Sequence, residues 1–360
     1  MIITGTVPTS SPLHITDGSR NAFDPETGRE ASNITATQRQ VVNTPEGRKY
    51  VPCMNAGTFR GRIRAAATSL VVDAVLQHNA QMSVPLYNAI RHGDTGGSIT
   101  RSEIDPRDVI AVQNNPFFSL FGGGPRMLAA GVMIKALYAA SAEYFASAVS
   151  GNSEPPEGVR PSNSYINIER SYSSWDLRKR PSEKTVDVIH DYDNAMDELL
   201  IGEAKDRNKK RKKDDATPSE NDSNNSVRTS NILGHETIIA GTPMVFSIRL
   251  QKHLTPVAKG FFLTALAKAL NDGNFGGIVR NDYGNFDLKS AAANLKAGGD
   301  PIFGYDDNTG ELHPVGAGEE FELAYLEWLQ DGQSWIAADL WSAAGFSGDH
   351  MFINAAKTAA

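Results

Sequence analysis

Three arginines, Arg60, Arg62 and Arg64, lie close together in the segment NAGTFRGRIRAAA, which then continues into an apolar stretch. The first turn of a helix leaves N–H groups without partners and carries the positive end of the helix dipole, so it attracts anions. Gly57 and Gly61 have no side chain and would let a polyanion backbone come close. The segment therefore fits either a solvated basic helix end or a seat for phosphates.

A glycine-rich loop, LFGGGPR, contains Gly122, Gly123 and Arg126. It lacks the GK[ST] ending of a P-loop, and the sequence has no GxGxxG fingerprint after a strand here. The loop is thus a weak candidate for a nucleotide site. Its glycines are suited to a place where a backbone approaches closely.

A third segment, SYINIERSYSSWDLRKRP, alternates aromatic and basic side chains. Its candidate contact residues are Arg170, Tyr172, Trp175, Arg178, Lys179 and Arg180. Aromatic rings stack on bases and guanidinium groups bind phosphates, so this mixture is typical of proteins that bind single-stranded nucleic acid.

Signals for catalysis are weak. The sequence contains no G-x-S-x-G and no HExxH, and its single cysteine, Cys53, excludes an internal disulfide and a cysteine-built zinc site. His14, in SPLHI, is more typical of a structural histidine than of a general base. The acidic run at 190–198 could hold a divalent metal, but a solvated acidic face is the favoured interpretation. We predict no catalytic residue, no metal and no cofactor.

Composition limits the kind of partner. The chain has 360 residues and a formal net charge of −7, which argues against a uniformly basic nucleic-acid-binding surface. Positive charge is concentrated at 205–213, where seven basic residues stand against Asp206 alone. This run belongs to a polar stretch, 203–231, that we predict to be a disordered insertion; whether it contacts nucleic acid stays open. The N-terminus does not resemble a signal peptide and no apolar run could span a bilayer, so we expect a cytoplasmic protein.

The order of the predicted elements indicates an α+β fold. Strands are predicted at 2–7, 48–52, 244–250 and within 275–288, and helices at 59–78 (capped by Thr58), 257–270 and 318–345. Residues 80–115 look irregular, and the segment AAGVMIKALYAASAEYF fits either a helix or a strand. The three tryptophans of the last helix, Trp328, Trp335 and Trp341, are expected to pack in the core. Strand, helix, strand, helix and strand in this order suggest an interrupted ferredoxin-like unit of the RRM type.

Several segments together resemble a known family. IITGTVPTSSPLHITDGS, RKYVPCMNAGTFRGRIRAAA, LFGGG, INIERS, GHETIIAGTPMVFSIRL and FGGIVRNDYGNF occur in the order found in RAMP-superfamily backbone subunits of Class 1 CRISPR effector complexes. The segment VPCMNAGTFRGRIR is the most specific match, and the wording is most similar to the type IV branch. The resemblance implies an RRM-like palm with inserted finger and thumb elements. The expected parts are a first palm portion at 1–79, a finger region at 80–161, a thumb at 162–236, a second palm portion at 237–300 and a C-terminal helical segment at 301–360.

The resemblance also implies a function. Several copies would polymerise along one CRISPR RNA in a prokaryotic cytoplasm and present it to a DNA or RNA target, with other effector subunits, and in type IV systems a helicase, as further partners. The expected RNA-binding residues are His14, Gly57, Thr58, Phe59, Arg60, Arg62, Arg64, Gly122, Gly123, Arg126, Arg170, Tyr172, Trp175, Arg178, Lys179 and Arg180.

An enzymatic alternative is a RAMP endoribonuclease that cleaves target or precursor RNA. Relatives that cut RNA use an aspartate upstream of the segment matched at Pro52. The corresponding positions here, Thr37, Gln38 and Arg39, hold no acid, and Asp17 and Asp24 lie farther upstream. The resemblance therefore implies a non-catalytic binder in antiviral or anti-plasmid defence.

Overall fold

The computed structural model describes residues 1–24, 29–78, 80–94, 112, 114–151, 155, 157–176, 228–277, 282–331, 344–346 and 352–354. The chain divides into two compact units. The first is formed by residues 1–20, 36–167 and 236–360, and the second by residues 21–35 and 168–235. Helices and antiparallel sheets are both present, which confirms the predicted α+β class.

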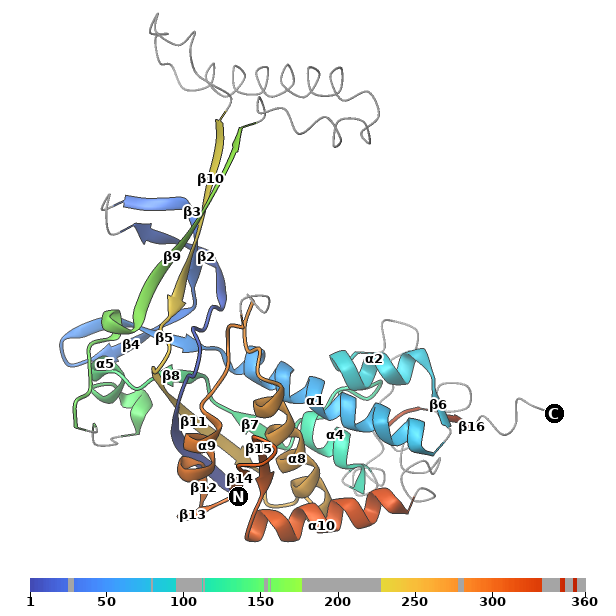
Figure 1. Ribbon diagram of the computed structural model, residues 1–360. Helices are drawn as coiled ribbons and strands as arrows, with labels where there is room; N and C mark the ends of the chain where they lie inside the picture. Colours follow the sequence, from blue (N-terminus) through green and yellow to red (C-terminus); the bar gives the residue numbers. More distant parts are fainter. Residues whose placement is uncertain are drawn as a thin grey trace, which may run out of the picture. The chain divides into compact units, whose positions relative to one another are not determined.

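The sheet of the first unit has a ferredoxin-like centre (Figure 1). Its strands and helices are, in chain order, β1 (Ile2–Pro8), α1 (Ala56–Gln77), β8 (Leu137–Ala139), β11 (Pro243–Leu250), α8 (Pro256–Asp272) and β12 (Lys296–Ala297). In space these strands lie in the order β12-β1-β11-β8, and each neighbouring pair is antiparallel. A chain order of strand, helix, two strands, helix and strand with this spatial order is the split βαβ arrangement. The first unit therefore has a ferredoxin-like arrangement, as predicted, but two of its four strands differ from the prediction. β8 comes from the segment expected as a finger region, and β12 takes the place of the strand predicted within 275–288.

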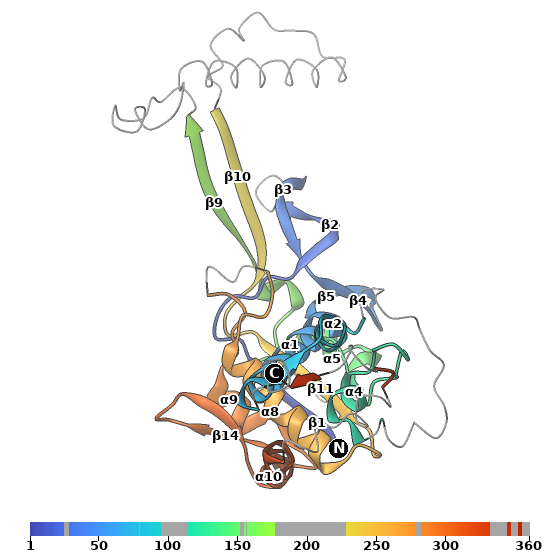
Figure 2. The ribbon, with the colours of Figure 1, turned by 90° about the vertical axis from the view of Figure 1, so that its right-hand side faces the viewer.

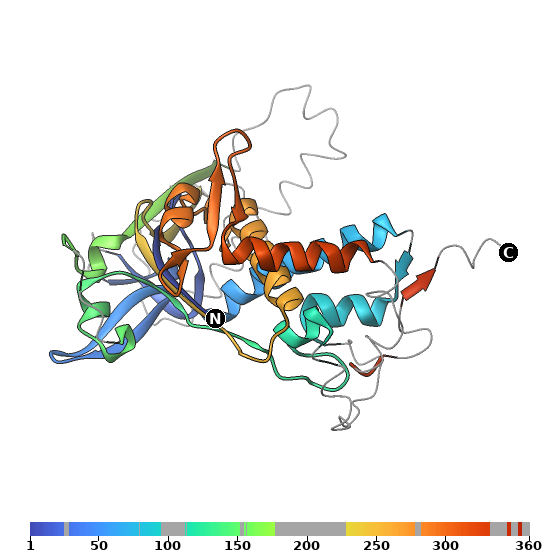
Figure 3. The same cartoon turned by 90° about the horizontal axis from the view of Figure 1, so that it is seen from below.

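Other elements of the first unit extend this centre. β7 (Val132–Ile134) also pairs with β11, β13 (Asp300–Pro301) continues one edge, and the hairpin of β4 (Arg39–Thr44) and β5 (Gly47–Met54) continues the other. Two small sheets pair β14 (Phe303–Asp306) with β15 (Glu311–Pro314) and β6 (Ala80–Met82) with β16 (Phe352–Asn354). The remaining helices are α2 (Val84–His92), α4 (Pro116–Phe121), α5 (Ala142–Phe145), η1 (Ala148–Ser150), η2 (Ser162–Tyr165), α9 (Leu288–Asn294) and α10 (Ala317–Gln330). Viewed from below, α1, α8 and α10 lie side by side (Figure 3).

Alternating apolar residues along the strands show which face of the palm sheet packs against the helices. Ile3 and Val7 of β1 and Phe246 and Ile248 of β11 are fully buried, whereas their neighbours along each strand are not. Phe59 of α1 packs edge-to-face on Phe246, with ring centroids 5.4 Å apart. Burying such side chains contributes about 1.5–3 kcal/mol each, so this face holds the helices on the sheet.

The second unit contains most of a four-stranded sheet ordered β2-β3-β10-β9. Its strands are β2 (Thr16–Asp24), β3 (Arg29–Thr37), β9 (Ile166–Asp176) and β10 (Arg228–Ile238). β9 and β10 run side by side as a two-stranded ribbon (Figure 2). β10 pairs in parallel with β3, where Gly234 lies opposite Ile34.

Several predicted elements need correction. α1 begins at Ala56, and its N-cap is Asn55, whose side-chain oxygen accepts a hydrogen bond from the N–H of Thr58 at 2.6 Å. Thr58 is thus the residue that is capped. Within the segment predicted as irregular, Ser83 caps the short helix α2, which the turn-rich sequence after it obscured. Of the two interpretations left open for the alanine-rich segment, the strand holds as two short strands, 132–134 and 137–139, and a short helix follows at 142–145.

The glycine-rich segment at 275–288 forms no strand in its described residues, 275–277 and 282–288. Gly276 and Gly284 adopt φ values of +116° and +85°, which an extended strand does not use, and only Phe286 forms an isolated bridge, to Thr9. Of the predicted disordered insertion, residues 228–231 belong to β10, where strand pairing supplies partners for the backbone, and the rest lies outside the described residues. α10 ends at Gln330 and carries Trp328, which packs against the core; Trp335 and Trp341 lie outside the described residues.

Candidate nucleic-acid interface

The first turn of α1 is exposed to solvent on one side and packs against the core on the other. Gly57 and Gly61 are exposed, and a Cβ at Gly61 would meet nothing within 4 Å. The N–H groups of Ala56 and Gly57 have no hydrogen-bond partner among the described residues. Phe59, in contrast, is fully buried between Phe246 and Phe275. The structure therefore gives Phe59 a packing role, in place of the RNA contact expected from the sequence.

Arg64 is used inside the protein. Its Nε donates to the carbonyl of Ile90 at 2.6 Å, and its Nη2 donates to the carbonyls of Ala89 at 2.6 Å and Gly122 at 3.4 Å. The first two carbonyls belong to the last turn of α2, where a cation interacts favourably with the helix dipole. Burial, and then the nearby charge of Arg60, lowers the pKa of Arg64 to about 10. The guanidinium remains charged at neutral pH and joins α1 to α2.

Arg60 is also bound to the main chain, because its Nη2 donates to the carbonyl of Phe121. Burial lowers its pKa. Only part of this side chain remains accessible, so its availability to a ligand is smaller than the sequence suggested.

Arg62 differs from its two neighbours. It is half-buried and makes no hydrogen bond or ion pair within the part of the chain that the structure describes. Its pKa is lowered by burial and by the charge of Arg91 from α2, and raised to a smaller extent by Asp272. Of the three arginines, Arg62 is the one whose donors are free for a bound phosphate.

The glycine-rich loop joins this cluster. Gly122 adopts a φ of +63°, and a Cβ there would lie 2.2 Å from the carbonyl oxygen of Leu128. A Cβ at Gly123 would lie 2.6 Å from the carbonyl oxygen of Gly93. The glycines thus permit close packing of the chain on itself, while the carbonyls of Phe121 and Gly122 bind Arg60 and Arg64. The arginine segment and the glycine-rich loop, which are far apart in the sequence, therefore contact each other directly.

Arg126 lies apart from these contacts, at a cleft of about 380 Å³ beside the loop and the turn after β11. The residues that line this cleft are Val112, Phe118, Ser119, Arg126, Met127, Leu128, Ala129, Ala130, Gly131, Gln251 and His253.

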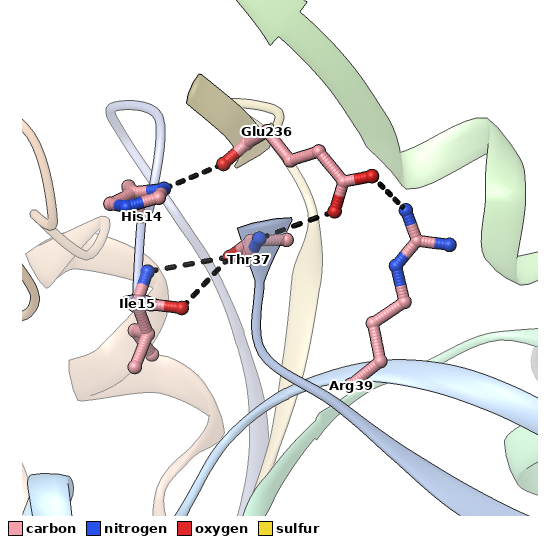
Figure 4. A network of polar contacts seen from close by, with 5 residues as sticks. All are labelled: His14, Ile15, Thr37, Arg39 and Glu236. Carbon is pink, nitrogen blue, oxygen red and sulfur yellow. Dashed lines mark hydrogen bonds and ion pairs between the residues drawn. The ribbon is translucent and has the colours of Figure 1, made fainter. Parts of the chain in front are cut away.

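His14 belongs to a buried polar network (Figure 4). Its Nδ1 donates to the carbonyl of Glu236 at 2.7 Å, and the hydroxyl of Thr16 lies 3.2 Å from Nε2. The carboxylate of Glu236, only 1% exposed, accepts from Nη2 of Arg39 at 3.0 Å and from the N–H of Thr37 at 3.2 Å. The structure therefore gives His14 a structural role.

Sequence reasoning missed Glu236 as the partner of His14, and Thr37 and Arg39 as the partners of the Glu236 carboxylate. Thr37 also accepts a hydrogen bond from the N–H of Ile15, so the network joins three chain segments. One feature of the sequence does point to this network: Glu236 stands directly before the apolar run TIIAG. An acid next to an apolar run is expected to be buried, and a buried carboxylate needs a partner.

The aromatic and basic segment after residue 164 is described only in part. Arg170, Tyr172 and Trp175 lie in β9, and Arg178, Lys179 and Arg180 lie outside the described residues. Their role in RNA binding stays a prediction. Within the described residues no helix is long and apolar enough to cross a membrane, and no group of three candidate metal ligands occurs.

Comparisons with known proteins give a limited result. No family model matches the sequence, and no curated protein matches it. Among solved structures, a chain of the "Type IV-B CRISPR Complex" is similar, with a TM-score of 0.45 and 12% identity over 92% of this chain and 100% of that chain. At this TM-score the likeness assigns no residue of this chain to a function.

Proposed function

We propose that this chain is a non-catalytic backbone subunit of a Class 1 CRISPR effector complex, most similar to the type IV branch, that binds CRISPR RNA along the start of α1. The observation that carries the proposal is that the free amides of Ala56 and Gly57 and a free arginine, Arg62, lie at the start of the same helix, beside the exposed Gly57 and Gly61. Five residues along a helix span about 7.5 Å, so a chain of phosphates that follows the start of α1 can engage both groups.

The sequence supports the polymeric part of the proposal. The matched segments follow in the family's order over most of the chain, and the most specific one, VPCMNAGTFRGRIR, contains this helix start. We therefore propose several copies on one guide RNA, which base-pairs with a DNA or RNA target while the protein holds the backbone. Other effector subunits, and a helicase, are the expected partners.

We also propose that the chain does not cleave RNA, because of the residues at the position where cleaving relatives have an aspartate. Thr37 occupies this position; it is fully buried, and its N–H donates a hydrogen bond to Glu236. The acid beside it, Glu236, is buried and ion-paired with Arg39 at 3.0 Å. A carboxylate in this state is not accessible to an RNA 2′-hydroxyl.

The test is purification after co-expression with the matching CRISPR array and partner subunits. We expect a large particle with protected RNA, measured by mass and by the A260/A280 ratio, and no cleavage of added target RNA. Arg62→Glu should abolish recovery of the protected guide RNA while leaving a folded protein. Arg48→Glu, at an exposed position of the β4–β5 hairpin, should leave this recovery unchanged. A monomer without RNA from the unmodified chain would refute the proposal, and target cleavage would favour the endoribonuclease.

A further inference from the structure

The palm sheet has a second face, directed away from α1 and α8. Register places Thr4 of β1 opposite Lys296 on one side and Ser247 on the other. Because every second residue shares a face, Ile2 and Thr6 lie on the same side as Thr4, opposite to the buried Ile3 and Val7. Arg249 pairs with Ile2, and Val245 pairs with Thr6, so the same side of β11 is also brought to this face.

A groove of about 400 Å³ lies over this face. It is lined by Thr4, Gly5, Thr6, Lys135, Ala136, Tyr138, Tyr144, Phe145, Val149, Ser150, Val245, Phe246 and Ser247. One wall is aromatic: the rings of Tyr138 and Tyr144 are stacked with centroids 5.5 Å apart, and Phe145 meets Tyr144 edge-on at 5.1 Å. The strands supply hydroxyl groups from Thr4, Thr6 and Ser247. Tyr144 itself is only 7% exposed, so the surface available for stacking is that of Tyr138 and Phe145, beside the strand hydroxyl groups.

Three exposed cations lie on this face. Lys135, Arg249 and Lys296 are exposed, and their side chains make no hydrogen bond or ion pair with any described residue. Among the residues that the structure describes, no aspartate or glutamate lines the groove. Glu143 of α5 is already bound, accepting from the N–H and hydroxyl of Ser162 at 2.7 Å each. The chain as a whole has a net charge of −7, so these unpaired cations are a local patch of positive charge. Such a patch attracts an anionic partner.

We propose that this open sheet face is a second binding surface, for single-stranded nucleic acid, with phosphates on Lys135, Arg249 and Lys296 and a base against the Tyr138–Phe145 wall. Aromatic walls beside free cations suit unstacked bases, and serine and threonine hydroxyls suit phosphates and sugar hydroxyls. The surface goes beyond the guide site proposed on α1, because it lies on the opposite face of the sheet and uses none of the same residues.

The test measures binding of short labelled single-stranded RNA and DNA of one sequence on the Arg62→Glu background, so that the α1 site does not contribute. Lys135→Glu with Lys296→Glu should weaken both probes about tenfold and lower the salt slope by about 2, because two phosphate contacts are lost. Arg48→Glu with Lys289→Glu, which changes the net charge equally at exposed sites elsewhere, should change affinity less than about twofold. Thermal melts verify that all variants are folded.

Ultraviolet crosslinking of the unmodified chain gives an independent readout that needs no variant. Crosslinks should map to residues 136–150 and 243–250, and Phe145→Ala should reduce them. Unchanged affinity in the double lysine variant, or crosslinks confined to 55–64, would overturn the inference. Loss of self-association with unchanged RNA affinity would overturn it too, in favour of a contact between copies. The affinity measurements, which are made on the Arg62→Glu background, are independent of whether guide RNA is bound at α1.

Discussion

The start of α1 and the open face of the palm sheet are both rich in basic residues, yet they use them differently. At α1, Arg60 and Arg64 donate to carbonyls of the chain's own loops, and Arg62 remains free. On the sheet face, exposed cations find no carbonyl or carboxylate partner among the described residues. Backbone carbonyls left without partners at a helix end or in a glycine turn bind whatever donor is nearby. Charge pattern alone therefore overestimates the binding residues wherever such carbonyls are close.

The largest effect expected from this comparison is on stability. Arg64→Ala should lower the free energy of unfolding by about 3 kcal/mol, because several charged hydrogen bonds are lost and the carbonyls of Ala89 and Ile90 remain without their donor. Arg62→Ala should change it by less than about 0.5 kcal/mol. Urea unfolding followed by circular dichroism measures both. Equal effects in the two variants would mean that the contrast between a bound and a free arginine is wrong.

A second expected effect compares glycines. Gly122→Ala should lower the free energy of unfolding by about 2–3 kcal/mol, because its Cβ would lie 2.2 Å from a carbonyl oxygen and the backbone has a positive φ. Gly61→Ala, in a helix with open space around it, should instead stabilise by about 0.5–1 kcal/mol.

The same two variants separate fold from binding. If guide RNA approaches α1 closely, Gly61→Ala should weaken RNA binding while it raises the melting temperature. A variant that is more stable and binds RNA as well as the unmodified chain would remove Gly61 from the site.

The elements that could be predicted are those with a strong local period. Alternation in 2–7 and 244–250 identified β1 and β11, and the apolar spacing identified α1 and α8, because each of these buries one face on a common core. These elements supply two of the four strands of the ferredoxin-like centre; β12 was not predicted, and β8 lies in the segment that fitted either a helix or a strand. Short elements such as α2 and β8 depend on neighbours far along the chain, so local composition carried little information about them.

The candidate site was predicted less completely than the fold. The arginine segment and the glycine loop were both identified, but their contact was not, since it depends on carbonyls brought together by folding. The sequence does not indicate the basic face formed by Lys135, Arg249 and Lys296 either. These residues are far apart in sequence, and only the strand register brings them to one face.

A smaller effect concerns the wall of the sheet-face groove, where Glu143 holds Ser162 beside α5. Burial raises the pKa of this carboxyl, but hydrogen bonds from Ser162 and Ser141 outweigh it, so the net pKa is lowered. A depressed carboxyl pKa stabilises the fold above the unfolded value of 4.5 and loses that contribution as the pH falls through the folded value. Because Glu143 is partly exposed, Glu143→Gln should lower the free energy of unfolding by less than about 1 kcal/mol at neutral pH. The substitution should have no effect at a pH where the carboxyl is protonated in both the folded and the unfolded protein. Unfolding in urea at neutral and acidic pH measures the difference, and a cost that persists in acid would contradict the assignment.

The smallest expected quantity is the coupling between the two basic surfaces. Arg62→Gln and Lys135→Gln should each weaken binding of a long single-stranded RNA, and their effects should add to within about 0.5 kcal/mol, because sites on opposite faces of a sheet share no phosphate. Anisotropy titrations of the two single variants and the double variant complete the cycle, with Arg48→Gln in place of Lys135→Gln as the control. A coupling well above that bound would mean that both cations contact one stretch of RNA. The start of α1 and the sheet face would then be two ends of a single surface, and the contrast between them would lie only in how many cations each keeps free.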